Sequence, residues 1–97
     1  MKILITSASS AAAHQLKSKL NTGEIVLGDY MDLPDFMVNS GKMLRLPDPK
    51  SGAYSHQILT LCLDNDISTI YPLREEEAVL LKEAVQLFKE YNIEINT

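Results

Sequence analysis

Residues 2–20 read KILITSASSAAAHQLKSKL, and this stretch decides the fold. Residues 2–6 form a short apolar run rich in β-branched side chains, which is typical of a buried strand. Small residues follow at 7–10, and residues 11–20 carry apolar side chains at helical spacing. A strand, a tight turn and a helix in this order predict the start of a βαβ unit of the dinucleotide-binding type.

The turn at residues 7–10 is the first candidate site. In a βαβ unit such a turn directs backbone N–H groups and the positive end of the helix dipole to a point just beyond the strand, where an anion is favoured. Ser7, Ala8, Ser9 and Ser10 are therefore predicted to bind an anion. The turn lacks the glycines that identify a nucleotide site. Serine and alanine can form an anion-binding turn here only if none of the residues needs positive φ. The alternative is that Ser9 or Ser10 simply caps the helix.

Strand and helix signals alternate along the rest of the chain. Further strands are expected at 24–28, 43–46, 68–71 and 93–95, and helices at about 10–20, 52–64 and 75–91, with a short one near 35–39. This alternation implies a parallel sheet with right-handed crossovers. We expect a single α/β domain over residues 1–97, with a Rossmann-like three-layer αβα architecture. Its parallel sheet should have about five strands in the order 3-2-1-4-5.

Composition narrows the class of protein. The 97 residues include 9 basic and 13 acidic side chains, a net charge of −4, which argues against nucleic acid or an anionic membrane as partner. No apolar run approaches the roughly 20 residues that cross a bilayer, and Met1 leads directly into a strand, so we expect no signal peptide. Cys62 has no second cysteine to pair with, which fits a reducing cytoplasm, and its place on an apolar stripe predicts an inert core thiol.

Two charged positions at strand ends are further candidates. Asp29 directly follows the second predicted strand, where dinucleotide folds place the acid that binds a ribose hydroxyl; the alternative is a solvated acidic loop with Asp32 and Asp35. Arg74 follows the fourth strand and could bind a carboxylate or phosphate in bidentate fashion; the alternative is a surface ion pair with residues 75–77. No catalytic triad, metal site or Walker A loop is predicted.

The last predicted helix carries more apolar surface than one core stripe needs. Val79, Leu80 and Leu87 lie off its main stripe. The stripe expected on the buried side consists of Ala78, Leu81, Ala84, Val85, Phe88 and Tyr91. The two interpretations are a wide core face, or a flank that packs against something else, such as a second copy in a homodimer. Because the chain stops directly after a predicted strand, we expect it to be the front piece of a longer polypeptide.

Four stretches together resemble a known family. They are residues 2–10, the Leu-Gly-Asp-Tyr of 27–30, residues 41–47, and the Ile-Tyr-Pro-Leu-Arg-Glu-Glu-Glu of 70–77, with support from residues 87–93. The chain is similar to the pre-ATP-grasp domain that begins ATP-grasp ligases, above all to that of the carbamoyl-phosphate synthase large subunit. Pro72 followed by an acidic helix start is the most specific part of this likeness.

The resemblance implies a role within a larger enzyme. Such ligases use ATP to activate a carboxylate as an acyl phosphate, which an amine or thiol attacks, and later domains hold ATP and Mg²⁺. The first domain then has no catalytic residue or cofactor of its own, docks against the downstream ATP-grasp domains, and helps to bind a carboxylate or phosphate substrate. The resemblance places residues 7–10, Arg74 and Glu77 at the substrate cleft.

Two other classes of function stay open. The chain could be a free-standing Rossmann-like module that binds an anionic small molecule or nucleotide. It could instead be an interaction or dimerisation domain that uses the flank around Leu80 and Leu87.

Overall fold

The computed structural model describes residues 2–8, 10–20, 24–31, 33–41 and 43–97. Within this part of the chain the strands are β1 (Lys2–Ile5), β2 (Glu24–Asp29), β3 (Met43–Arg45), β4 (Ile67–Tyr71) and β5 (Glu94–Ile95). They form one five-stranded sheet in the order β3-β2-β1-β4-β5, and every neighbouring pair is parallel. The predicted sheet and strand order are confirmed.

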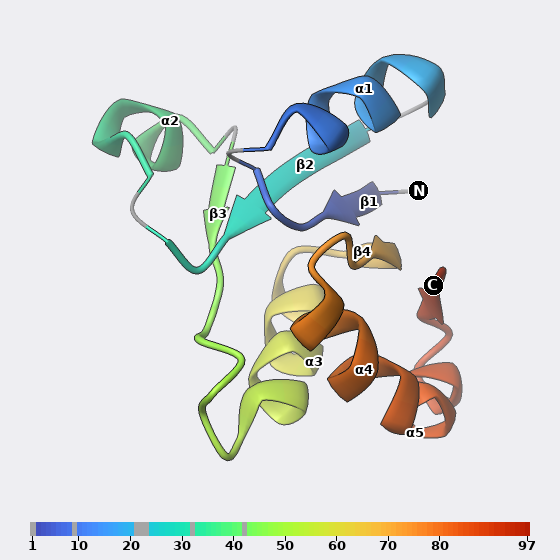
Figure 1. Cartoon of the computed structure of the whole chain (residues 1–97). Coiled ribbons are helices and arrows are strands. Elements are labelled where there is room, and N and C mark those ends of the chain that lie inside the picture. Colours follow the sequence, from blue (N-terminus) through green and yellow to red (C-terminus); the bar gives the residue numbers. More distant parts are fainter. Residues whose placement is uncertain (1, 9, 21–23, 32, 42) are drawn as a thin grey trace.

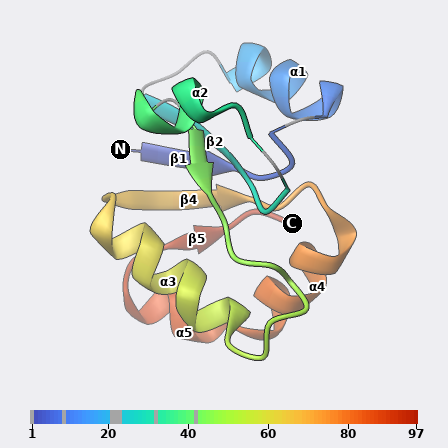
Figure 2. The same ribbon diagram turned by 90° about the vertical axis from the view of Figure 1, so that its left-hand side faces the viewer.

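Helices cover both faces of this sheet (Figures 1 and 2). They are α1 (Ala11–Leu20), α2 (Asp35–Asn39), α3 (Tyr54–Asp64), α4 (Glu75–Glu83) and α5 (Val85–Glu90). Figure 1 shows α1 and α2 on one side of the strands and α3, α4 and α5 on the other. The three-layer αβα architecture is therefore as predicted. Among the described helices, none combines the length and the apolar character that crossing a bilayer demands.

Successive side chains of β1 serve two separate hydrophobic clusters. Ile3 and Ile5 lie in a cluster with Ala13 of α1, whereas Leu4 lies in the cluster that contains Phe88 of α5. This division follows from the two-residue period of a strand, which turns neighbouring side chains to opposite faces. Because both faces are buried, the central strands read as continuous apolar runs in the sequence.

The helix expected at 75–91 is two helices, which corrects the sequence interpretation. Ala84 has φ −102° and ψ 11°, outside helical values, and it separates α4 from α5. Leu81 before the break and Phe88 after it are both fully buried. Val85 and Tyr91, both expected on the buried stripe, are 45% and 49% exposed. The break changes the direction of the chain, so a single helical period does not describe both segments.

The apolar flank of this region belongs mostly to the core. Leu80 and Leu87 are partly buried against the cluster around Phe88, which supports the wide core face. Val79 and Val85 remain about half exposed.

Gly28 allows β2 and the chain after β3 to approach closely. A Cβ at this position would lie 3.0 Å from Leu46 side-chain atoms and 3.1 Å from the carbonyl oxygen of Leu44. Both separations are shorter than ordinary van der Waals contact. The Leu46 N–H donates to the carbonyl of Asp29 at 2.9 Å, which fixes the end of β2.

Candidate functional site

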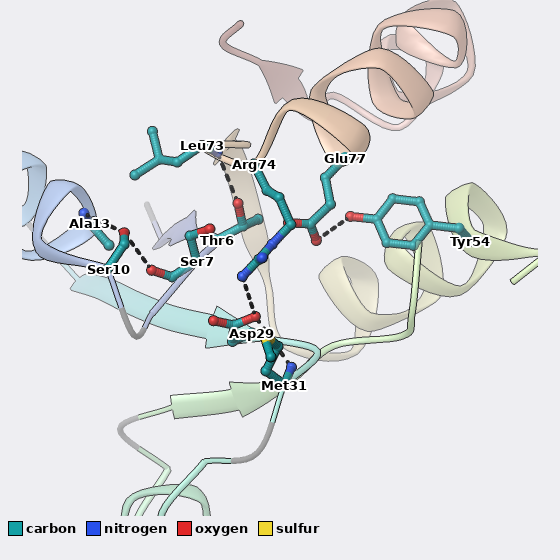
Figure 3. A network of polar contacts seen from close by, with 10 residues as sticks. All are labelled: Thr6, Ser7, Ser10, Ala13, Asp29, Met31, Tyr54, Leu73, Arg74 and Glu77. Carbon is teal, nitrogen blue, oxygen red and sulfur yellow. Dashed lines mark hydrogen bonds and ion pairs between the residues drawn. The ribbon is translucent and has the colours of Figure 1, made fainter. Parts of the chain in front are cut away.

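The carboxyl ends of β1, β2 and β4 meet at one edge of the sheet. β1 and β4 are neighbours, yet the helices that follow them, α1 and α4, lie on opposite faces (Figure 1). This is the topological switch point at which parallel α/β sheets bind ligands. Thr6 follows β1, Asp29 ends β2, and Arg74 follows β4, so three predicted strand ends contribute polar side chains to one network (Figure 3).

Arg74 is at the centre of this network. Its Nη2 donates to Oδ1 of Asp29 at 2.9 Å, and its Nε lies 3.6 Å from Oε2 of Glu77. The guanidinium carbon is 4.7 Å from the centre of the Tyr30 ring, a cation–π contact. Asp29 Oδ1 also accepts from the N–H of Met31 at 3.3 Å. These contacts fix the side chain between β2 and α4.

Glu77 lies in the first turn of α4 and is fully buried. The hydroxyl of Tyr54, at the start of α3, donates to its Oε1 at 2.7 Å. Oε2 of Glu77 and Nε of Arg74 are buried and face each other without a hydrogen bond to any described atom. Burial raises the pKa of Glu77, although the Tyr54 hydrogen bond, the Arg74 charge and the Thr6 hydroxyl each lower it. Loss of water around the carboxylate thus outweighs its polar contacts.

Thr6 attaches the segment after β4 to β1. Its Oγ1 accepts from the N–H of Leu73 at 2.9 Å, and its N–H donates to the carbonyl of Tyr71 at 3.1 Å. Arg74 is the residue that follows Leu73 in the chain. The Thr6 hydroxyl therefore fixes the position of the backbone from which the Arg74 side chain extends.

The turn after β1 needs positive φ, contrary to the condition drawn from its sequence. Ser7 has φ +58°, a left-handed conformation that costs a non-glycine residue roughly 1–2 kcal/mol. Its carbonyl accepts from both the N–H and the hydroxyl of Ser10, at 2.9 and 2.8 Å. These two bonds hold the turn in its strained form.

The other described residues of the turn are engaged within the protein. Ser10 Oγ accepts from the N–H of Ala13 at 3.3 Å, so Ser10 caps α1. The Ala8 N–H donates to the carbonyl of Gly28 at 3.0 Å, and the Ala8 side chain is buried. Ser9 lies outside the described residues. Binding of an anion by this turn stays a prediction.

Comparison with known proteins identifies the family. A family model described as "PylC-like, N-terminal domain" matches residues 3–96. The chain belongs to this family. The match supports the resemblance to pre-ATP-grasp domains of ATP-grasp ligases, and the finer likeness to carbamoyl-phosphate synthase stays a prediction. A search of curated proteins found no match.

In this PylC-like N-terminal domain, three of the candidate residues form one cluster. Asp29 and Glu77 lie on either side of Arg74, and Ser7 lies beside Thr6 (Figure 3). Asp29 is completely buried, so the structure shows it holding Arg74; its contact with a ribose hydroxyl stays a prediction. The alternative that Arg74 forms a surface ion pair is wrong, because both of its carboxylate partners, Asp29 and Glu77, are buried.

Three members of the cluster escaped the sequence interpretation. Thr6 ends the strand predicted at 2–6, Tyr30 lies in the stretch 27–30 that carries the family resemblance, and Tyr54 lies in the helix predicted at 52–64; none of the three is among the predicted site residues. Tyr54 lies 23 residues before its partner Glu77, and no local pattern links the two. For Thr6, its place directly after the first strand was a usable signal, because that edge is where ligands gather. No group of His, Cys, Asp and Glu side chains in the described residues is arranged to hold a metal ion.

Proposed function

We propose that this chain is the N-terminal domain of an ATP-dependent ligase that joins a carboxylate to an amine. In this proposal the domain supplies contacts on the substrate side of the active site and a surface on which the downstream ATP-grasp domains dock. It catalyses nothing alone, and ATP and Mg²⁺ are bound by the downstream domains. The family match over residues 3–96 supports the ligase context.

The single observation that carries the substrate-side role is the ion pair between Arg74 and Asp29, with a distance of 2.9 Å. It joins the carboxyl ends of β2 and β4 across β1, at the switch point. A charged side chain held at that edge suits recognition of a charged substrate group. We place the enzyme in the cytoplasm, where a reducing environment suits the buried free thiol of Cys62.

The test uses the full product of the gene that encodes this chain. ADP release should require both a carboxylic acid and an amine. A product that lacks residues 1–97 should lose most of this activity, and the separately expressed chain should restore it when added. A truncated product with an unchanged KM for the carboxylic acid would contradict the proposed role.

The same measurements address the alternatives. Heat stabilisation of the 97-residue chain by ATP, without any requirement for further domains, would favour a free-standing nucleotide-binding module. Light scattering that gives twice the monomer mass would favour a dimerisation domain.

A further inference from the structure

We propose that Arg74 is the residue with which this domain contacts its ligand, that the contacted group is an oxyanion, and that Asp29 and Glu77 are positioning residues. The oxyanion is a carboxylate or a phosphate. The inference rests on the proposed function for its premise that a ligand comes to this edge of the sheet. The sequence predicts ligand contacts for several residues, and this inference assigns the contact to Arg74 alone.

Accessibility distinguishes the members of the network. The side chains of Asp29 and Glu77 have no exposed surface, whereas that of Arg74 is 24% exposed. Tyr54 and Thr6 are buried as well. A ligand that approaches the network therefore meets the Arg74 side chain and not a carboxylate. Since a guanidinium carries five N–H donors and no acceptor, its partner must be an acceptor, and an anion is the best one.

The surroundings of Arg74 direct its exposed part. Nε is buried against Glu77, Nη2 is bonded to Asp29, and the guanidinium stacks on the ring of Tyr30. The exposed surface therefore lies on the remainder of the side chain. Figure 3 shows the side chain extended from Glu77 toward Asp29, with Ser7 on the neighbouring strand end. An arginine ordered in advance loses little freedom when it binds, which is the advantage of two buried carboxylates here.

Charge in the network couples ligand binding to a proton. With Asp29 and Glu77 both ionised, one guanidinium leaves a net charge of −1, which opposes an anion. Burial raises the pKa of Glu77, and a proton there leaves the network neutral. The groups facing Glu77 are Tyr54 from α3, Thr6 directly after β1, and the charges of Arg74 and Asp29. A neutral Glu77 leaves Nη2 bonded to Asp29, so the binding of an anion that keeps its own charge should tighten as pH falls through the pKa of Glu77.

The experiment is an NMR titration of the 97-residue chain with sodium acetate and, separately, inorganic phosphate, against sodium chloride of equal ionic strength. The Nε–H signal of Arg74 and the amide of Leu73 should shift and saturate with at least one of the two oxyanions. Arg74→Gln should lose about tenfold or more in affinity, since hydrogen bonds to charged groups are the strong ones. Arg45→Gln, at an exposed arginine of β3, is the matched control and should bind as wild type.

The variant Asp29→Asn distinguishes two roles of Asp29: it either positions the Arg74 side chain or acts only through its negative charge. Removing a negative charge would tighten anion binding if charge alone mattered, whereas a loosened arginine should bind more weakly. Tighter binding by Asp29→Asn, or saturable binding that survives Arg74→Gln, would overturn the inference. If Arg74→Gln does not fold by circular dichroism, Arg74→Lys replaces it and should also weaken binding, because it keeps the charge and loses the planar fork.

The two proposals can fail separately. Anion binding at Arg74 without ADP release by the full product would remove the ligase and leave this inference. ADP release without any oxyanion shift in the chain would remove the inference and leave the ligase.

Discussion

Tyr54→Phe tests whether the buried polar network contributes to stability. The substitution removes one hydroxyl and keeps the ring, so no large cavity forms. The lost bond is the 2.7 Å donation from Tyr54 to Oε1 of Glu77, and both side chains are almost completely buried. Among the described residues, Arg74, at 3.6 Å from Oε2, and Thr6 are then left to stabilise the carboxylate.

The magnitude follows from the charge state of Glu77. A hydrogen bond to a charged group contributes about 1.5–3 kcal/mol, and one between neutral groups about 1 kcal/mol. The Tyr54 bond lowers the pKa of Glu77, so it favours the ionised form. The loss in Tyr54→Phe should therefore be about 1 kcal/mol at pH 4, where the raised pKa leaves Glu77 protonated, and should increase to about 2 kcal/mol as pH rises through that pKa. The larger loss corresponds to roughly 8–16 °C in Tm for a domain of this size.

Urea unfolding followed by circular dichroism measures both values, with equal m-values required for the comparison. The matched control is Tyr91→Phe, which removes a hydroxyl from a half-exposed tyrosine and should change stability by less than about 0.5 kcal/mol. In a double-mutant cycle with Glu77→Gln, the coupling energy should exceed about 1 kcal/mol. The reasoning is refuted if Tyr54→Phe matches the control, or if its cost falls as pH is raised from 4.

Three further predictions concern single positions. Because the folded-state pKa of Glu77 is raised, protonation of this residue stabilises the fold. The stabilisation is complete below about pH 4.5 and is lost as pH rises through the folded pKa. Glu77→Gln should abolish this decline in the free energy of unfolding, measured by urea titrations across pH. Gly28→Ala should destabilise by about 1–3 kcal/mol through its 3.0 Å contacts, whereas Gly52→Ala, in open space, should be nearly neutral; equal Tm values for the two would exclude this account. Burial raises the pKa of Cys62 to about 12, so a thiol reagent should label it at the rate of unfolding, and immediate labelling in native buffer would contradict that.

Prediction of the fold succeeded where local patterns carry the information. The strand at residues 2–6 and the helix after it are visible in hydrophobic periodicity, and the short helix at 35–39 matches α2 (Asp35–Asn39). The single helix at 75–91 was wrong because Ala84 is a good helix former, and the packing of Leu81 and Phe88 on the core outweighs its intrinsic preference. Ser7 adopts positive φ, which the sequence does not indicate because no glycine stands at this position.

By itself the sequence determined the alternation of strands and helices and the resemblance to a ligase family, because these depend on residues close together in the chain. Only the tertiary structure decided that Asp29 and Glu77 are buried partners of Arg74, and that Tyr54 completes the network. Their partnership depends on which strand ends become neighbours and on how much water the packed helices exclude. Both are properties of the assembled sheet, and no local pattern of residues encodes them.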